Sequence, residues 1–265
     1  MIKINDIDIK INKFPDGSLL IKNNPWASLI PRAKTVFTWT FENNEELVTL
    51  IYLVKHYRHH GIKELHLCMP YLPNARQDRT KDASDIFTLK YFADVINWLE
   101  FESVKVLDPH SSVGEALINN LIVVTPEKYI TMAGIDCTPD MLFFPDEGSM
   151  KRYAGMFKSK YAFGIKKRDW ETGKIEGLDI AGDTDAIENH KILIVDDICS
   201  RGGTFLHSAK KLKELGAKEI YLYITHCENT ILEGDLLTSG LIEKVYTTNS
   251  VFTKEHERIE VFELE

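Results

Sequence analysis

The chain has 265 residues, of which 44% are hydrophobic and 10% aromatic, so we expect a folded globular protein with room for two domains. The formal net charge of −8 argues against a general nucleic-acid surface, and anions must then be held by local basic side chains, backbone N–H groups or metal ions. The four cysteines form no C-x-x-C pair, and no stretch has the pattern of a signal peptide or a membrane span. We therefore expect a cytoplasmic protein with reduced thiols and no membrane partner.

The first half of the chain is predicted to contain strands followed by helices. Isoleucines at alternate positions between Ile2 and Ile11, interrupted by Asn5-Asp6, indicate a hairpin. Further strands are predicted at residues 18–22, 34–40, 63–70 and 103–108, and amphipathic helices at 43–61 and 83–101.

The second half repeats this pattern. Strands are predicted at residues 141–146, 161–167, 191–197, 218–226 and 244–249, and helices at 149–157 and 204–216. Strands that alternate with helices predict an α/β fold with mostly parallel sheets. We place a domain boundary near residue 125, which gives domains 1–125 and 126–265, and we expect ligands at the carboxyl ends of the strands.

The stretch ILIVDDICSRGGTF, residues 192–205, carries the clearest chemical pattern. A buried strand ends in Asp196 and Asp197, and Gly202 and Gly203 then lead to Thr204 at the start of a helix. A helix N-terminus that follows glycines favours a phosphate, because its free N–H groups and its dipole both attract an anion. Two adjacent carboxylates suit the vicinal hydroxyls of a ribose, directly or through Mg²⁺. The stretch therefore predicts a site for a phosphorylated ribose, although a capped helix with a solvated turn would have a similar pattern.

The same stretch resembles the ribose-phosphate loop of type I phosphoribosyltransferases and of ribose-phosphate pyrophosphokinases (PRPP synthetases). A second segment, MPYLPNARQDR at residues 69–79, resembles the ATP-binding segment of the pyrophosphokinases alone. Its arginines offer guanidinium groups and its glutamine an amide that both donates and accepts. The resemblance assigns ATP binding to Arg76, Gln77, Asp78 and Arg79. It also implies two tandem phosphoribosyltransferase-like domains, the first with the ATP-binding segment and the second with the ribose-phosphate loop.

Further segments match the pyrophosphokinase family in its own order along the chain. FPDG resembles a turn that reaches the ATP site of a neighbouring subunit, which gives Phe14 and Asp16 an ATP-binding role. LDPHSS gives His110 a contact with Mg-ATP, and FPDEGSMKR gives Asp146 a metal or ribose role. GIKKRDW resembles the start of a catalytic loop and places Lys167 and Arg168 over the transferred phosphates.

The resemblance implies an enzyme that moves the β,γ-diphosphate of ATP to the C1 hydroxyl of ribose 5-phosphate, giving PRPP and AMP. Mg²⁺ is the implied cofactor, near His110 and Asp146. Asp196 and Asp197 would hold the ribose hydroxyls, and the loop Ser200, Arg201, Gly202, Gly203 and Thr204 would hold the 5-phosphate. A homo-oligomer, either a dimer or a hexamer with shared ATP sites, is implied as well.

Three segments depart from the family pattern. Ser18 replaces a glutamate, Asp169 replaces an arginine, and Ser200-Arg201 replaces an aspartate and a threonine in the phosphate loop. The departures fit a divergent PRPP synthetase, but they also fit an acceptor with an esterified 5-phosphate such as ADP-ribose, whose second phosphate Arg201 would neutralise. A non-catalytic regulatory relative remains a lesser alternative, and a plain phosphoribosyltransferase would have no need of the ATP-binding segment.

Overall fold

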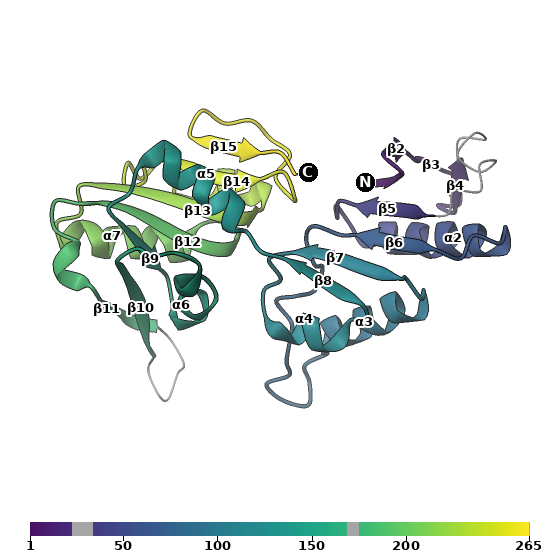
Figure 1. The fold of residues 1–265 in the computed structure, drawn as a ribbon, viewed down its shortest axis with the longest axis horizontal. Helices are drawn as coiled ribbons and strands as arrows, with labels where there is room; N and C mark the ends of the chain where they lie inside the picture. Colours follow the sequence, from purple (N-terminus) through teal and green to yellow (C-terminus); the bar gives the residue numbers. More distant parts are fainter. Residues whose placement is uncertain (23–33, 169–174, 265) are drawn as a thin grey trace. The chain divides into compact units, whose positions relative to one another are not determined.

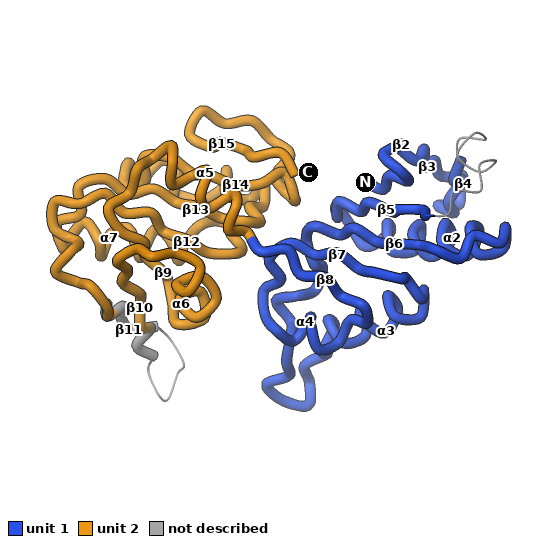
Figure 2. The backbone as a smooth tube through the Cα atoms, viewed as in Figure 1, with its two compact units in different colours: residues 1–125 blue, residues 126–265 orange. Residues whose placement is uncertain are grey.

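The computed structural model describes residues 1–22, 34–168 and 175–264, and it does not describe the side chains of residues 166–178. The chain divides into two compact units, Met1–Thr125 and Pro126–Glu265 (Figure 2). Each unit has its own sheet and its own hydrophobic core. Within the described ranges, no helix is long and apolar enough to cross a membrane.

In the described part of unit 1, six strands form a sheet in the order β2-β1-β5-β6-β7-β8 (Figure 1). The strands are β1 (Ile2–Ile4), β2 (Ile7–Asp8), β5 (Thr35–Trp39), β6 (Leu65–Cys68), β7 (Ser103–Leu107) and β8 (Leu121–Val124). The helices are α2 (Glu45–His59), α3 (Thr88–Trp98) and α4 (Ser112–Leu117). The strands from β5 to β8 are parallel to their neighbours, whereas β1 and β2 pair antiparallel at one edge.

The predicted N-terminal hairpin is confirmed as β1 and β2. Asn5 and Asp6 have φ angles of 48° and 66°, the left-handed conformation that two-residue hairpin turns require. The later isoleucines do not continue this hairpin. Instead, β3 (Lys10–Lys13) pairs with β4 (Leu19–Lys22) in a separate two-stranded sheet.

The core of unit 1 is built on aromatic side chains of β5. Phe37 and Trp39 are fully buried, and alternate residues of a strand point to the same face of a sheet. Phe37 contacts Tyr57 of α2 edge to face, with ring centroids 5.5 Å apart, and Trp39 contacts Phe92 of α3 at 6.1 Å. Helices α2 and α3 therefore cover one face of this sheet. The polar segments that follow β6 and β7 lie at the carboxyl ends of these strands.

In the described part of unit 2, seven strands form a sheet in the order β11-β10-β9-β12-β13-β14-β15 (Figure 1). They are β9 (Met141–Phe144), β10 (Tyr161–Arg168), β11 (Ile175–Gly182), β12 (Lys191–Cys199), β13 (Glu219–Cys227), β14 (Val245–Thr248) and β15 (Ile259–Phe262). The α-helices are α5 (Glu127–Cys137), α6 (Glu147–Tyr153) and α7 (Gly203–Glu214), and short 3₁₀ turns include η1 (Ala154–Met156), η2 (Thr184–Ala186) and η3 (Asn229–Glu233). Only the pair β10 and β11 is antiparallel among these strands, so the predicted α/β class with mostly parallel sheets is confirmed in both units.

Two kinds of difference separate the predicted elements from the observed ones. Helix α3 begins at Thr88 rather than at residue 83, because the Asp82 carboxylate accepts the backbone N–H of Ser84 at 2.8 Å and forms a turn there. The sequence patterns did not predict α4, α5, β8, β11 or β15. The remaining predicted strands and helices lie within a few residues of their observed bounds.

Candidate active site

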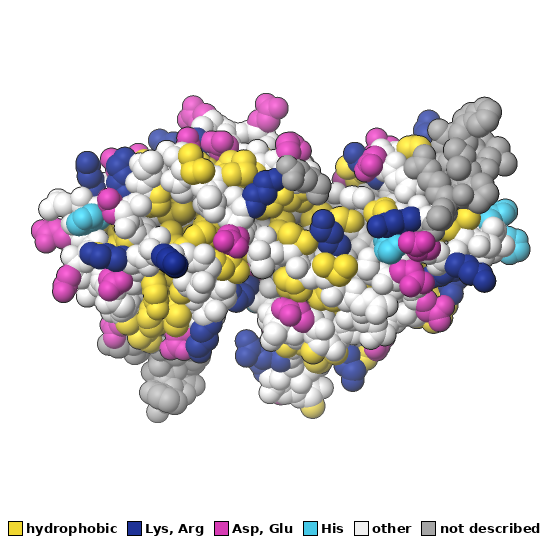
Figure 3. Space-filling view, viewed as in Figure 1, with side chains coloured by type: hydrophobic (Ala, Val, Ile, Leu, Met, Phe, Trp, Pro, Cys, Tyr) yellow, Lys and Arg dark blue, Asp and Glu magenta, His cyan; other side chains and the backbone are white. Residues whose placement is uncertain are grey.

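Acidic and basic side chains are interspersed over the face of the molecule in Figure 3, so that view offers no broad basic surface for an anion. The strand ends are then the place to look for local groups. In unit 2, β12 lies between β9 and β13, and all three strands run parallel. The segments that follow β9, β12 and β13 therefore leave the sheet at the same edge.

The predicted ribose aspartates lie on β12 near its carboxyl end. Asp197 is buried, with 4% of its side chain exposed, and Asp196 is half-buried. Asp146 follows the neighbouring strand β9 and is the N-cap of α6, where its carboxylate accepts the backbone N–H groups of Gly148 and Ser149 at 3.0 and 3.1 Å. The capping role explains the position of Asp146 without a metal, and its charge still acts on Asp196.

Arg152 is a residue of this site to which the sequence patterns gave no role. It lies at the end of α6, and its Nη2 donates to Asp197 Oδ1 at 2.8 Å and to Asp196 Oδ1 at 3.4 Å. About a quarter of the Arg152 side chain is exposed (24%), so the ion pairs are largely shielded from water. The FPDEGSMKR match ends at this arginine, and the short helix that follows Asp146 could have indicated that Arg152 stays near the same edge as the aspartates.

The neighbours of Asp196 act on its carboxyl in opposite directions. Burial raises the pKa of the Asp196 carboxyl well above its ordinary value, and the neighbouring Asp197 carboxylate raises it further. The Arg152 guanidinium opposes this shift, and Asp146 adds to it. Arg152 contacts both aspartates, and the carboxylate oxygens of the pair can still accept donors such as the hydroxyls of a sugar.

The loop after β12 has the backbone of an anion site. Gly202 has a φ of 79°, in the left-handed region, and a Cβ there would lie 2.8 Å from Cδ2 of Leu236. Helix α7 begins at the next residue, Gly203, so the first N–H groups of the helix lie in the loop. The structure therefore has Asp196, Asp197, the glycines and Thr204 at one strand end and helix start of unit 2, and their binding of a phosphorylated ribose stays a prediction.

The two unusual side chains of this loop both contact the segment after β13. Ser200 Oγ donates to Glu228 Oε2 at 2.6 Å, and Arg201 Nη2 donates to Glu233 Oε2 at 2.9 Å. Arg201 and Glu233 are exposed, with 71% and 58% of their side chains accessible. The sequence patterns had no signal for either glutamate, because both lie about thirty residues further along the chain.

In unit 1, the predicted ATP-binding segment and His110 follow neighbouring strands. The chain leaves β6 and β7 side by side, since Met69 N donates to Lys105 O at 2.8 Å and Leu107 N to Pro70 O at 3.0 Å. Arg76 is exposed in a turn just beyond β6, and His110 is half-buried just before α4. Both parts of the predicted ATP site therefore begin at the carboxyl edge of the unit 1 sheet.

The other residues of the ATP-binding segment have local partners. Gln77 Oε1 accepts the hydroxyl of Thr88 at 2.7 Å, which links the segment to the start of α3. Arg79 Nε lies 3.4 Å from Asp78 Oδ1, and the Arg79 side chain is almost fully exposed. An exposed guanidinium in a loose pair of this kind is free to turn toward a phosphate.

The predicted residues for a neighbouring subunit lie at the turn of the β3–β4 hairpin. Phe14 is exposed, and Asp16 Oδ1 accepts both the N–H and the hydroxyl of Ser18, at 2.9 and 2.6 Å. These hydrogen bonds lower the pKa of the Asp16 carboxyl, the bond from the Ser18 hydroxyl most. Ser18, which departs from the family pattern, thus helps to order the turn.

The predicted catalytic pair lies at the end of β10. The backbone of Lys167 and Arg168 pairs with β11, with a register shift between them, and their side chains lie outside the described part of the structure, as does the whole of Asp169. Within the described residues, no three His, Cys, Asp or Glu side chains are arranged to hold a metal ion. Mg²⁺ in ATP-dependent enzymes commonly has one or two protein carboxylates and otherwise water and substrate phosphates, so Asp146 and the paired aspartates fit a metal that arrives with the nucleotide.

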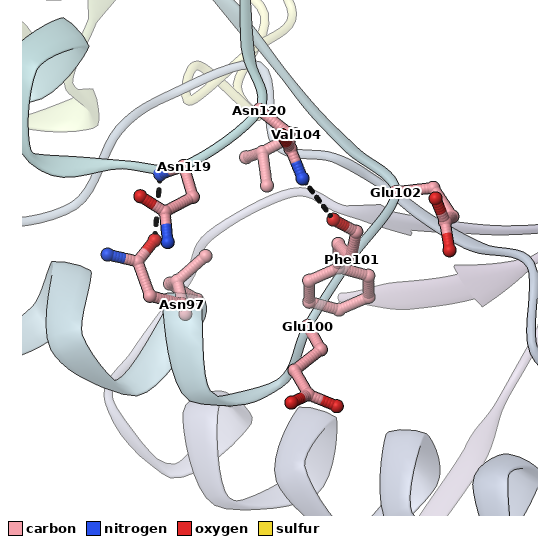
Figure 4. Close-up of a pocket in the computed structure, with 8 residues that line it drawn as sticks. Asn97, Glu100, Phe101, Glu102, Val104, Asn119 and Asn120 are labelled. Atoms are coloured by element: carbon pink, nitrogen blue, oxygen red, sulfur yellow. Dashed lines mark hydrogen bonds between the residues drawn. The ribbon is translucent and has the colours of Figure 1, made fainter.

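A pocket of ≈ 230 Å³ lies elsewhere in unit 1, between the end of α3 and the start of β7 (Figure 4). Asn97 at its wall accepts the N–H of Asn119 at 2.8 Å, and Asn120 donates to the carbonyl of Phe101 at 3.0 Å. The pocket is at the amino end of β7, the opposite end from His110. The side-chain amides of Asn97 and Asn120 form hydrogen bonds with neighbouring backbone groups, so they brace this part of the fold. The pocket is separate from the predicted ATP site.

Comparisons with known proteins agree with both halves of this arrangement. The family model described as the N-terminal domain of ribose phosphate pyrophosphokinase matches residues 1–99. The chain is 27% identical to the ribose-phosphate pyrophosphokinase of Thermococcus kodakarensis over 254 residues, which cover 93% of this chain and 87% of the relative. It is 28% identical to that of Bacillus subtilis over 229 residues, covering 83% and 70% of the two chains.

A solved structure shares the fold. The crystal structure of phosphoribosylpyrophosphate synthetase from Mycobacterium smegmatis is similar with a TM-score of 0.78 and 17% sequence identity, over 97% of this chain and 87% of that one. The likeness extends across both units, as does the alignment with the sequence relatives.

Proposed function

The chain belongs to the ribose-phosphate pyrophosphokinase family, and from this premise we propose that it transfers the β,γ-diphosphate of ATP to the C1 hydroxyl of ribose 5-phosphate, giving PRPP and AMP. The observation that carries the proposal is the unit 2 site: paired carboxylates at a strand end beside a glycine loop at a helix N-terminus. This site suits a ribose with a phosphate, and the relatives that the chain resembles are named for that chemistry.

The acceptor is held by unit 2 in this proposal. Asp196 and Asp197 accept hydrogen bonds from the ribose hydroxyls, and the loop of Ser200 to Thr204 surrounds the 5-phosphate with N–H groups. This orientation fixes the C1 hydroxyl for an in-line attack on the β-phosphorus of ATP, and the bond between the α- and β-phosphates breaks to release AMP. Positioning supplies much of the rate, since no covalent intermediate with the protein is needed.

The nucleotide is held by unit 1. Arg76, Gln77 and Arg79 bind ATP with their guanidinium and amide groups, and His110 lies on the neighbouring strand end. Lys167 and Arg168 contribute positive charge over the transferred diphosphate. Each such cation is worth about 3 kcal/mol of transition-state stabilisation, by analogy with single donors to developing anions.

The metal belongs to the proposal as well. Mg²⁺ would bind with oxygens of ATP near His110 in unit 1, and with the ribose near Asp146 in unit 2, and would neutralise charge on the phosphates when bound. The family's use of ATP is consistent with this requirement. We also propose that the chain forms a homo-oligomer, in which Phe14 and Asp16 contribute to the ATP site of a neighbouring subunit. We propose a cytoplasmic location, where ATP is available.

The test is ³¹P NMR of the purified chain with Mg-ATP and ribose 5-phosphate. We expect AMP to appear together with the paired resonances of a diphosphate on C1. A chain in which Lys167 and Arg168 are both replaced by alanine is the control, and it should release AMP at least about 100-fold more slowly. Failure of the unmodified chain to release AMP with any acceptor would overturn the proposal and favour the non-catalytic regulatory relative.

One observation favours a second acceptor. Arg201 replaces a neutral residue of the family pattern, and its side chain is largely exposed at the rim of the loop, paired with the exposed Glu233. Exposed pairs of this kind contribute about 0–1 kcal/mol, so Arg201 can leave Glu233 at little expense for a second phosphate. ADP-ribose presents that phosphate and keeps the same C1 hydroxyl.

ADP-ribose is therefore offered in a parallel NMR tube. Turnover of ADP-ribose that falls about tenfold or more in Arg201→Thr, with ribose 5-phosphate turnover unaffected, would support the second acceptor. Absence of turnover, or turnover that Arg201→Thr leaves unchanged, would reject it.

A further inference from the structure

The segment after β13, residues 228–236, forms a wall along the phosphate loop, and we refer to it as the wall segment. Glu228 N donates to the carbonyl of Cys199 at 2.8 Å, immediately before the loop. A Cβ at Gly234 would overlap the carbonyl oxygen of Arg201, and Leu236 lies against Gly202. The wall segment thus touches the loop at successive residues, and the loop backbone depends on where the wall lies.

The wall segment is itself fixed by the core of unit 2. Ile231 and Leu236 are both buried, and both belong to the hydrophobic cluster that includes strands β12 and β13. Burial of two such side chains contributes about 3–6 kcal/mol, which is enough to hold a short segment in one position. The wall is therefore a rigid support for the loop.

Glu228 connects this support to the first residue of the loop. Its Oε2 accepts the hydroxyl of Ser200 at 2.6 Å and the hydroxyl of Thr230 at 3.2 Å. The carboxylate is half-buried, so its hydrogen bonds are screened less than those of the exposed pair between Arg201 and Glu233. Since the Ser200 hydroxyl donates to Glu228, it is not available to donate to a phosphate.

We propose that Glu228 is a positioning residue for the acceptor's phosphate, which holds Ser200 so that the backbone N–H groups of the loop point at the anion. The inference rests on the proposed function, because it takes the loop to be the acceptor-phosphate site. Ser200 then contributes its backbone and its tether to Glu228, while the N–H groups at the start of α7 and the Thr204 hydroxyl bind the phosphate. Loss of the tether lets the loop move and weakens binding of the acceptor without a direct effect on ATP.

The test compares Glu228→Ala, Glu228→Gln, Ser200→Ala and the double variant with Ala at both positions. Glu243→Ala is the matched control, because Glu243 is exposed at the amino end of β14, the opposite edge of the sheet. The dissociation constant of ribose 5-phosphate is measured by calorimetry for each chain, together with the KM for ATP and the melting temperature. ADP-ribose replaces ribose 5-phosphate as the probe if the unmodified chain binds only ADP-ribose.

We expect Glu228→Ala to weaken binding of the acceptor by about tenfold or more, the range for a hydrogen bond to a charged group. The KM for ATP and the melting temperature should stay at the values of Glu243→Ala. Glu228→Gln should recover most of the affinity, because the amide oxygen still accepts the Ser200 hydroxyl. The double variant should bind no worse than Glu228→Ala, since both changes remove the same tether.

Several results would overturn the inference. These are unchanged acceptor affinity in Glu228→Ala, a double variant whose loss is the product of the two single losses, and Glu228→Gln as weak as Glu228→Ala. A parallel loss of ATP affinity and melting temperature would also reject it, because Glu228 would then only support the fold. A chain that binds the acceptor but forms no C1 diphosphate would defeat the proposed function and leave this comparison decisive, whereas a chain that binds neither probe would defeat both.

Discussion

The proposed ribose-phosphate site brings several charged side chains together in a small, partly buried space. Asp196 and Asp197 lie beside Asp146, and Arg152 is the guanidinium that contacts the pair. Ionisation of Asp196 opposes folding, because its carboxylate loses hydration on burial and lies beside the like charge of Asp197. The same carboxylates can accept hydrogen bonds from the hydroxyls of a sugar. Binding of the acceptor substrate should therefore offset part of the hydration that these carboxylates lose on folding.

Asp196→Asn should therefore stabilise the folded chain while it weakens acceptor binding. The pKa of Asp196 is raised above its value in the unfolded chain, so its contribution favours folding at low pH and is lost as pH rises through the folded pKa. At neutral pH the ionised form is a burden, and the asparagine should raise the free energy of unfolding by about 1 kcal/mol, with Arg152 and Asp197 left as a balanced pair. Urea titrations at pH 7.5 test this, and Asp185→Asn, at an exposed position on η2, should show no change. A less stable Asp196→Asn chain would contradict it.

The pH dependence of acceptor use should report the same charges. In the proposed function an ionised Asp196 accepts the ribose hydroxyls more strongly than a protonated one, so kcat/KM for the acceptor should rise with pH through a pKa above the ordinary range of an aspartate. Arg152 lowers that pKa, whereas Asp197 and Asp146 raise it, so Arg152→Met should move the acid limb to higher pH. Arg152→Lys keeps the charge and should give an intermediate profile. Profiles from pH 5 to 9 at saturating ATP check this, and identical limbs in all three chains would refute it.

The sequence predicted the residues of this site that are adjacent along the chain. It did not predict those that come close to the site only in the folded structure. The carboxylates and glycines could be predicted because they are adjacent in sequence, so a single strand end and helix start bring them together. Glu228 and Glu233 could not, because their roles depend on the path of the chain after the next strand. Ser200 was predicted as part of the phosphate loop, and the bond from its hydroxyl to Glu228 is a contact that the sequence did not indicate.

At the scale of elements, the phosphate loop is a short connection held between α7 and the wall segment. Its backbone must turn through a left-handed conformation at Gly202, and Leu236 leaves no space for a side chain there. Gly203 is different, since a Cβ at that position would meet nothing within 4 Å. The two glycines therefore form a natural pair for a comparison.

Gly202→Ala should lower the free energy of unfolding by about 2 kcal/mol, from the left-handed backbone and the overlap with Leu236 together. Gly203→Ala, at the first position of α7, should leave stability within about 0.5 kcal/mol of the unmodified chain. Thermal and urea unfolding measure both. Equal stabilities for the two variants would mean that the loop is not held against the wall segment as the structure has it.

Sequence patterns predicted the elements with a clear apolar stripe, alternation or run, and missed short elements and those without such a pattern. In α5, Tyr129 and Ile130 are buried while Met132 and Ile135 are exposed, so apolar residues occur on both faces and no helical stripe appears. Helix α4 has six residues, too few for a period to be recognised. Strand β5 was predicted correctly because its buried residues alternate, and β9 and β12 because each contains a continuous apolar run.

At the scale of the whole molecule, two units with separate cores are proposed to divide the substrates. The predicted ATP-binding segment and His110 lie at the strand ends of unit 1, and the ribose-phosphate site lies at those of unit 2. A reaction between the two substrates needs both units, but binding of each substrate alone needs one. This division can be tested in the intact chain with one substitution in each unit.

Arg76→Ala in unit 1 should raise the KM for ATP by about tenfold or more, because a charged hydrogen bond to phosphate is lost, and should leave the dissociation constant of the acceptor unchanged. Asp197→Asn in unit 2 should do the reverse, since the ribose hydroxyls lose an ionised acceptor while the turn around Arg76 is untouched. Each substrate is titrated alone by calorimetry and then at saturation of the other in the AMP assay, so that each variant serves as the control for the other. If either variant weakens both substrates equally when they are titrated alone, the substrates are not divided between the units, and Arg76 or Asp197 must be assigned to a site that both substrates share.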